Sequence, residues 1–223
     1  MAGIYIHYPY CKQKCHYCNF FSLATHKFRN EFVDALLEEI SQRKTYIKDP
    51  VQSIYFGGGT PSLLSVDEIQ RIMDHLTHSF SVDSSAEITL EANPDDLDIR
   101  YLKDLQKTDI NRLSIGIQSF NNDELMAVNR VHNAESAMDC VKNAQDAGFG
   151  NLSIDLIYGI PNSTVESWRK NLEITHSLQA PHLSAYSLTQ ETRTAYDVWV
   201  KKEKLFPPND EKAIEEYQML QDY

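Results

Sequence analysis

Three cysteines near the amino end of the chain are spaced to share one inorganic ligand. Cys11, Cys15 and Cys18 lie within eight residues, and the fourth cysteine is far along the chain. Thiolates are the protein ligands of iron–sulfur clusters and of structural zinc. Three thiolates can hold three irons of a four-iron cluster and leave the last iron open to a small molecule. We expect Lys12 and Lys14 to favour the thiolate forms.

A structural zinc site is the alternative use of these thiols, with His7 or His16 as a fourth ligand. Zinc sites usually combine two cysteine or histidine pairs on separate turns, whereas all three cysteines here share a single loop. Ligand softness by itself admits both kinds of site. Cys140 falls on an apolar helical stripe, so we expect it to be a buried core thiol.

Glycines and polar side chains follow several predicted strands. The run Gly57–Pro61 comes directly after the second strand, and glycines there let a ligand approach the backbone. Glu91, Gln118 and Asp155 end three further strands, and Arg130 is the cation expected to pair with a carboxylate. Chemistry in (β/α) barrels takes place at this end of the strands, so these residues are candidates for a binding site. A tight turn, helix capping and a solvated arginine are the alternative explanations.

Apolar runs alternate with helical patterns along the chain. Strands are predicted over residues 3–7, 53–56, 86–92, 111–118, 151–157 and 182–188. Helices are predicted over residues 28–40, 69–80, 102–105, 134–144, 165–172 and 211–223. Strand–helix units in this order predict a parallel sheet with helices outside it. Because eight such units need about 250 residues, we expect a partial (β/α)6 TIM-like barrel over residues 1–206. Residues 207–223 are expected to begin a C-terminal region that is truncated here.

Local sequence signals predict where three of these helices begin or end. Ser65–Glu68 and Ser163–Glu166 both fit the Ser-x-x-Glu capping box, in which the serine and the glutamate satisfy free backbone N–H groups. Gly148 follows the helical stripe over residues 134–144 and is suited to end it.

Composition excludes several classes of protein. The 223 residues carry a formal net charge of −11, which argues against a broad nucleic-acid face. Eight glycines and eight prolines are too few for a linker-rich or disordered chain. No apolar run approaches the roughly 20 residues of a membrane span. No basic stretch precedes the apolar residues of the amino end, so we expect no signal peptide and a soluble, cytoplasmic protein.

The spacing Cys-x3-Cys-x2-Cys, with Tyr17 directly before the last cysteine, resembles the motif of the radical S-adenosylmethionine (SAM) superfamily. The resemblance implies a 4Fe–4S cluster whose open iron binds the amino and carboxylate groups of SAM. It also implies that the reduced cluster donates one electron, splits the sulfonium and yields a 5′-deoxyadenosyl radical. The glycine run after the second strand resembles the methionine-binding glycine motif of the same superfamily.

Further segments resemble one branch of that superfamily, the oxygen-independent coproporphyrinogen III oxidases and the HemW-type heme chaperones. They are residues 5–7, 57–64, 91–94, 112–120, 155–161 and 182–191. The resemblance implies that the cluster ligands are Cys11, Cys15 and Cys18. The residues that match the site of the cluster-bound SAM are Tyr5, Gly58 and Glu91. Those that match a second SAM site of the oxidases are Tyr17, Gly59, Thr60, Gln118, Arg130 and Asp155.

Two departures from the oxidases favour the chaperone type. The oxidases have another cysteine two residues after the third ligand, where this chain has Phe20, and a long extension before the first strand, which here begins at Gly3. The chaperone type implies heme binding and delivery, with heme-acceptor proteins and an electron donor as partners. The alternatives are a true enzyme, which converts coproporphyrinogen III to protoporphyrinogen IX by oxidative decarboxylation, and a structural zinc protein. Whether the chain is an enzyme stays open at this point.

Overall fold

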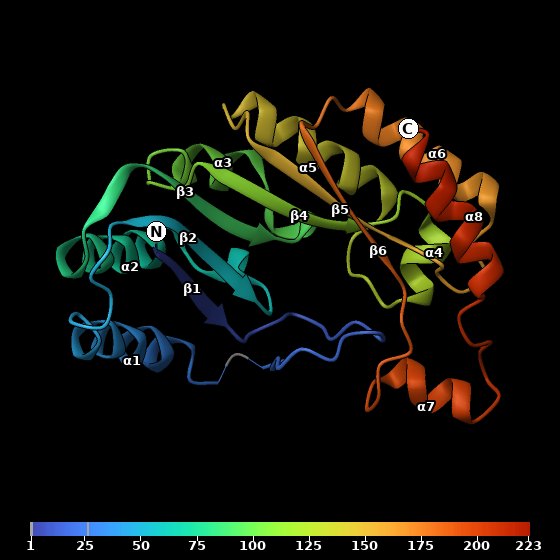
Figure 1. The fold of residues 1–223 in the computed structure, drawn as a ribbon, viewed down its shortest axis with the longest axis horizontal. Coiled ribbons are helices and arrows are strands. Elements are labelled where there is room, and N and C mark those ends of the chain that lie inside the picture. The colour runs from blue at the N-terminus through green and yellow to red at the C-terminus, as the bar shows by residue number, and fades with distance from the viewer. Residues whose placement is uncertain (1, 26) are drawn as a thin grey trace.

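One parallel sheet forms the centre of the computed structural model, which describes residues 2–25 and 27–223 (Figure 1). The strands follow one another in chain order across the sheet, and each neighbouring pair is parallel. Their bounds are β1 Ala2–Tyr8, β2 Val51–Gly58, β3 Val82–Ala92, β4 Arg112–Gln118, β5 Leu152–Tyr158 and β6 His182–Ser187. This order, with helices between the strands, confirms the predicted partial (β/α)6 barrel.

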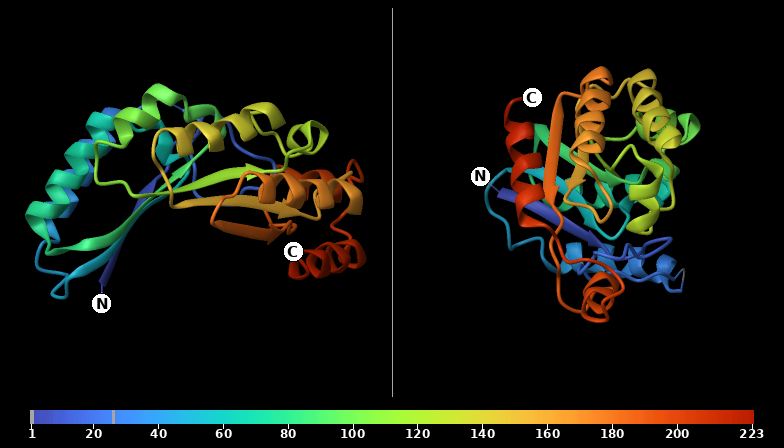
Figure 2. Two further views of the ribbon diagram at one scale, coloured as in Figure 1. Left: turned by 90° about the horizontal axis from the view of Figure 1, so that it is seen from above. Right: turned by 90° about the vertical axis from the view of Figure 1, so that its right-hand side faces the viewer.

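Helices follow the strands, and most of them line the outer side of the curved sheet, which Figure 2 shows from above. Their bounds are α1 Arg29–Gln42, α2 Val66–Ser79, α3 Ile99–Leu105, α4 Asn122–Ala127, α5 Ala134–Asp146, α6 Val165–Ser177, α7 Ala195–Lys201 and α8 Asp210–Gln221. Two 3-10 turns, η1 Pro61–Leu63 and η2 Pro94–Asp96, follow β2 and β3. No helix in the described part of the chain combines the length and the apolar character that crossing a membrane requires.

Side-chain alternation gives each central strand one apolar face and one polar face. In β4, Leu113, Ile115 and Ile117 are fully buried in the core beneath the helices. Between them come Arg112, Ser114, Gly116 and Gln118, which point to the other, concave side of the sheet. The hydrophobic effect therefore holds the helices to the convex face, while the concave face stays free for polar side chains.

The last helix, α8, packs against α6 and the carboxyl end of β5. Its Glu216 side chain is fully buried and accepts a hydrogen bond of 2.7 Å from the backbone N–H of Gly159. The Trp168 indole donates to the carbonyl of Glu216 over 2.8 Å. Residues 210–221 thus pack on the barrel, and the predicted domain boundary at residue 206 stays a prediction.

Most of the predicted elements are confirmed, with two helices added. The predictions missed α4 and α7, which are too short to show an apolar period. The capping box at Ser65 is present, and Gly148, with φ of 101°, follows the end of α5 as predicted. Cys140 is a buried core thiol.

The second predicted capping box is wrong by one residue. Thr164 is the N-cap of α6, and Ser167 completes the box. The hydroxyl of Ser163 is engaged elsewhere, because it accepts a hydrogen bond of 2.8 Å from Lys212 Nζ of α8. A contact between residues far apart in the sequence therefore decides which residue caps this helix.

The glycine run after β2 packs directly against the chain that leaves β1. The backbone N–H of Gly59 donates to Tyr8 O over 2.7 Å. A Cβ atom at Gly59 would lie 2.7 Å from Tyr10 O and 2.8 Å from the carbonyl carbon of Pro9. Gly58 has a φ of 115°, which side-chain-bearing residues rarely adopt. Two backbone segments meet here. Close backbone packing and the positive φ therefore account for these glycines without any ligand.

We therefore predict that Gly59→Ala lowers the free energy of unfolding by about 1–3 kcal/mol, because backbone atoms cannot yield to the added methyl group. Gly150→Ala is the matched control, since no atom lies within 4 Å of a Cβ placed there. We expect that control to change the stability by no more than about 1 kcal/mol. Urea denaturation followed by circular dichroism measures both values. Equal stabilities of the two variants would contradict the packing argument.

Candidate cofactor site

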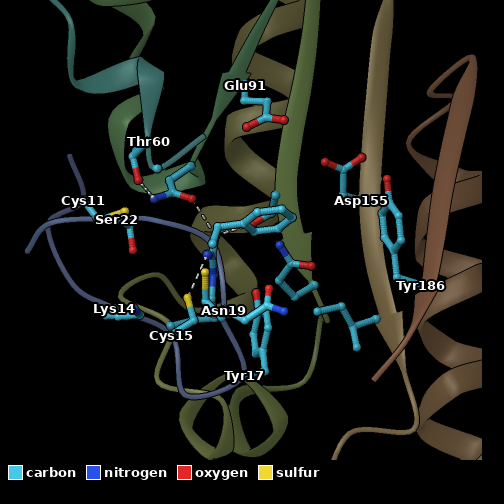
Figure 3. A pocket seen from close by; sticks show the side chains of 18 of the residues that line it. Cys11, Lys14, Cys15, Tyr17, Asn19, Ser22, Thr60, Glu91, Asp155 and Tyr186 are labelled. Atoms are coloured by element: carbon cyan, nitrogen blue, oxygen red, sulfur yellow. Dashed lines mark hydrogen bonds between the residues drawn. The ribbon is translucent and has the colours of Figure 1, made fainter. Parts of the chain in front are cut away.

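A cavity of about 460 Å³ opens at the carboxyl ends of the strands. The cysteine loop, residues 11–18, closes one side of it, and polar side chains from β3 to β5 line the other (Figure 3). The predicted site residues that line this cavity are Cys11, Cys15, Tyr17, Cys18, Gly58, Gly59, Thr60, Glu91, Gln118, Arg130 and Asp155. The parallel sheet therefore brings together residues that span most of the sequence.

Tyr5 is the predicted site residue that does not line the cavity. Its ring is more than half exposed and stacks on Tyr55 with a centroid separation of 6.1 Å. Its hydroxyl lies 3.2 Å from His7 Nδ1. The hydroxyl of Tyr55 donates to Glu91 Oε1 over 2.8 Å, so Tyr5 reaches the cavity only through its neighbour.

The three cysteines of the loop are unpaired and half-buried. Both histidines proposed as a fourth zinc ligand lie within hydrogen-bond distance of a backbone carbonyl. His7 Nε2 lies 3.0 Å from Phe21 O, and His16 Nδ1 lies 3.3 Å from Ala127 O. Within residues 2–25 and 27–223, no three histidine, cysteine or acidic side chains converge on one ion position. This donor set fits a multi-iron cluster, whose thiolates bind separate irons, better than it fits a single zinc ion.

Hydrogen bonds from the turn that follows α4 hold the cysteine loop. The backbone N–H of His16 donates to Val128 O over 3.2 Å. The side chain of Asn129 donates a hydrogen bond to Lys14 O over 2.9 Å. The backbone carbonyl of Asn129 accepts a hydrogen bond of 3.0 Å from the side-chain amide of Gln13. We call residues 127–130 the clasp. It fixes the backbone on both sides of Cys15.

Two further elements fix the ends of the same loop. The backbone N–H of Tyr196 in α7 donates to His16 O over 2.9 Å, and the Trp199 ring meets the His16 ring edge-on with centroids 4.3 Å apart. On the other side, Lys12 Nζ lies 2.8 Å from Asp95 Oδ2 and also pairs with Asp96 in η2. The loop is therefore rigidly placed, as a preformed binding site requires.

Lys14 acts on the thiol of Cys18 in the predicted direction, but burial has the larger effect. Burial raises the pKa of Cys18, and the neighbouring Cys15 and Cys11 raise it further. A hydrogen bond from the backbone of Phe20 and the charge of Lys14 lower it, so Lys14 favours the thiolate as expected. The charge of Lys12 is engaged by the carboxylates of η2.

Arg130 lies at the base of the cavity, next to the cysteine loop. It donates from Nη1 to Cys15 Sγ over 3.4 Å and from Nη2 to Asn93 Oδ1 over 2.8 Å and to Gly116 O. Its Nε is buried and lacks a hydrogen-bond partner in the described residues. Arg130 therefore forms no ion pair with a carboxylate of the described residues, contrary to the prediction, and its burial excludes the alternative of a solvated arginine.

Glu91 and Asp155 face the cavity from neighbouring parts of the sheet, as Figure 3 shows. Glu91 Oε2 accepts from the N–H of Gly58 over 3.2 Å. Asp155 Oδ2 accepts from the hydroxyl of Ser114 over 3.0 Å. Burial raises the pKa of both carboxyl groups, and the hydrogen bonds only partly oppose it. Neither carboxylate has an ion pair with a lysine or arginine of the described residues. The cavity is therefore suited to a ligand that carries positive charge.

Gln118 lines the cavity and has an unusual backbone conformation. Its φ is 72°, in the left-handed region, and the register between β4 and β5 shifts between Gly116 and Gln118. A shift of this kind re-aims a side chain at the end of a strand. The cost of left-handed backbone at a residue with a side chain is typical of functional positions.

Sequence reasoning missed several residues that support the predicted ones. Ser114 and Tyr55 hold the two carboxylates, Asn93 holds Arg130, and Ser22 lines the cavity with its hydroxyl buried and unpartnered in the described chain. The polar alternation along β4 was a usable signal for Ser114. The contacts of the clasp and α7 with the cysteine loop left no local signal, because they join residues more than 100 positions apart.

Known proteins with similar sequences include several that are named heme chaperone HemW. The sequence model of the Radical SAM superfamily matches residues 5–174. The heme chaperone HemW of Lactococcus lactis is 33% identical over 219 residues, covering 98% of this chain and 57% of the relative. HemW of Escherichia coli is 36% identical over 197 residues, covering 87% of this chain and 52% of the relative. The chain thus spans about half the length of the curated relatives it matches.

Solved structures agree with the sequence comparisons. Coproporphyrinogen III oxidase (HemN) from Escherichia coli, described as a radical SAM enzyme, matches 98% of this chain and 51% of its own with a TM-score of 0.87 and 30% identity. The radical SAM methyltransferase TsrM from Kitasatospora setae matches 91% of this chain and 39% of its own with a TM-score of 0.66. At 11% identity, TsrM supports the fold alone. Fold, cysteine spacing and the match over residues 5–174 together mean that this chain belongs to the radical SAM superfamily.

Proposed function

We propose that Cys11, Cys15 and Cys18 hold a 4Fe–4S cluster and that the cavity beside them binds SAM. The free thiols share one loop, which hydrogen bonds and ion pairs from other parts of the chain hold in place. When bound and reduced, such a cluster supplies the electron that cleaves the sulfonium of SAM. The chain's own residues hold the thiols in place and bind the nucleotide.

The charge of the cavity supports SAM as the ligand. SAM carries a sulfonium and an ammonium group, and Glu91 and Asp155 are half-buried carboxylates without a paired cation among the described residues. SAM also carries a carboxylate, which the unpartnered Nε–H of Arg130 is suited to bind. The other residues that we assign to SAM binding, from the resemblance and the cavity, are Tyr17, Gly58, Gly59, Thr60 and Gln118. Tyr5 stays assigned to the same site by resemblance alone.

We infer that the complete protein is a heme chaperone, which binds heme and transfers it to acceptor proteins in the cytoplasm. The observation that carries this proposal is the identity of 33–37% to proteins named heme chaperone HemW. Phe20, in place of the additional oxidase cysteine, supports it. No histidine or methionine is found among the described residues that line the cavity, and both are common ligands of heme iron. We therefore derive no heme ligand from this cavity.

Coproporphyrinogen III oxidation is the second candidate function. It is favoured by the TM-score of 0.87 to the oxidase HemN. The side chains of Phe20, Ile157, Tyr186 and Leu188 also line the cavity and offer apolar contacts for pyrrole rings. Fold similarity does not by itself determine function, so a direct comparison of the two activities is needed.

One experiment separates the two functions. The protein is purified without oxygen, its cluster is reconstituted, and it is titrated with heme while the absorbance of bound heme is followed. A second sample receives coproporphyrinogen III, SAM and a reductant, and its porphyrins are separated by chromatography. We expect heme binding and no conversion of coproporphyrinogen III. Formation of protoporphyrinogen IX by a sample with an intact cluster would establish the oxidase instead.

The ligand assignment predicts that Cys15→Ala abolishes assembly of the cluster, because two thiolates cannot hold a four-iron cluster in place. Iron and sulfide per chain, measured after anaerobic reconstitution, should fall close to zero. Cys140→Ala is the matched control, since this thiol is buried in the core away from the cavity lining, and it should keep the full iron content. A Cys15→Ala protein with the iron content of the unchanged chain would refute the assignment.

The cavity charge predicts that the ligand-free, cluster-free protein is destabilised by its own carboxylates. Because burial raises the pKa of Asp155, ionisation costs more in the folded chain than in the unfolded one, and stability falls as the pH rises through the raised pKa. We expect Asp155→Asn to raise the free energy of unfolding at pH 7 by about 0.5–2 kcal/mol. The gain should disappear below pH 3.8, the ordinary pKa of the side chain.

Urea denaturation at a series of pH values tests this expectation. Asp123→Asn provides the control, because Asp123 is exposed at the start of α4, and its stability difference should not follow the same pH course. A destabilised Asp155→Asn at neutral pH would show that hydrogen bonds from the serines outweigh the burial of the charge.

A further inference from the structure

One guanidinium group joins a presumed cluster ligand to the floor of the cavity. Arg130 Nη1 lies 3.4 Å from Cys15 Sγ, within hydrogen-bond distance for sulfur. The same group is anchored from below by Asn93 Oδ1 at 2.8 Å and by the carbonyl of Gly116. These anchors come from the end of β3 and from β4, and they hold the plane of the guanidinium in one orientation.

The arginine backbone is fixed as firmly as its side chain. Its N–H donates to Leu125 O over 2.9 Å, and it is the last residue of the clasp that holds the backbone beside Cys15. The donor and the sulfur that accepts from it are therefore held by one connected set of hydrogen bonds. In the part of the chain that the structure describes, no charged donor contacts the sulfur of Cys11 or Cys18 in this way.

Arg130 supplies a permanent positive charge at this position, because a guanidinium group is not deprotonated in proteins. A positive charge that donates to a cluster sulfur stabilises the reduced cluster more than the oxidised one, because reduction adds negative charge to iron and sulfur. Hydrogen bonds to the sulfurs and local charge are among the factors that set cluster potentials.

We propose that Arg130 tunes the reduction potential of the cluster through its hydrogen bond to Cys15, in addition to any contact it makes with SAM. The proposal rests on the proposed function, since it needs a cluster on the three thiols. It makes Arg130 a positioning and tuning residue for electron entry. The electron comes from an external one-electron reductant, and the cluster is reduced by one electron with no bond formed or broken at Arg130.

The test is a redox titration of the reconstituted protein in the absence of SAM, with the reduced cluster followed by electron paramagnetic resonance. Leaving SAM out separates this role from ligand binding. In Arg130→Met we expect the ratio of reduced to oxidised cluster at a fixed potential to fall about tenfold. For one electron this corresponds to a potential about 59 mV lower.

Two further variants make the result specific. Arg100→Met removes the same charge from the exposed surface of α3 and should leave the potential nearly unchanged. Arg130→Lys keeps a charge, but one ammonium cannot serve the sulfur, the amide and the carbonyl together, so its potential should lie between the other two. It also serves as the test if the methionine variant does not fold.

The outcomes distinguish a failure of the tuning role of Arg130 from a failure of the proposed cluster site. If the unchanged protein assembles no cluster, the proposed function fails. If Arg130→Met or Arg130→Lys carries the full iron content with an unchanged potential, only the tuning role is overturned. A shift in Arg130→Met no larger than that in Arg100→Met would likewise overturn it.

Discussion

The common direction of the six strands is the constraint on which the site depends. Since every strand runs the same way, every carboxyl end lies at one edge of the sheet, and each connection must return along the outside as a helix. The helices need an apolar surface to pack on, which the convex face supplies with residues such as Ile54, Leu90 and Ile154. No helix layer of the described chain packs on the concave face, so this face can carry polar side chains such as Glu91 and Asp155. One hydrophobic layer thus makes a polar cavity possible on its opposite side.

The rigidity of the cysteine loop comes from outside the loop. Residues 11–18 form no helix or strand, apart from a turn. Their geometry is imposed by the clasp, by η2 and by α7, which contribute hydrogen bonds, ion pairs and one ring contact. Each such contact is modest in energy, typically about 1 kcal/mol, but together they remove the freedom that a flexible metal-binding loop would lose on binding. The thiols are thereby held ready for their ligand.

Much of the fold and the site was predictable because it depends on local patterns. The alternation of apolar runs with helical periods located every strand, and the cysteine spacing located the loop. The predictions failed where distant residues decide the outcome. Lys212 donates a hydrogen bond to the hydroxyl of Ser163, and Thr164 rather than Ser163 is the N-cap of α6. The guanidinium of Arg130 was expected to pair with a carboxylate, but it donates hydrogen bonds to Asn93 and to the carbonyl of Gly116.

The long span of the contacts around the cysteine loop has a consequence for biosynthesis. The loop emerges first from the ribosome, but the clasp follows more than 100 residues later, and Tyr196, whose N–H holds His16, later still. Because domains generally acquire their folded contacts as synthesis proceeds, the thiols stay unplaced until most of the chain has been translated. The contacts that hold the cysteine loop are therefore complete only after residues near position 200 have been translated.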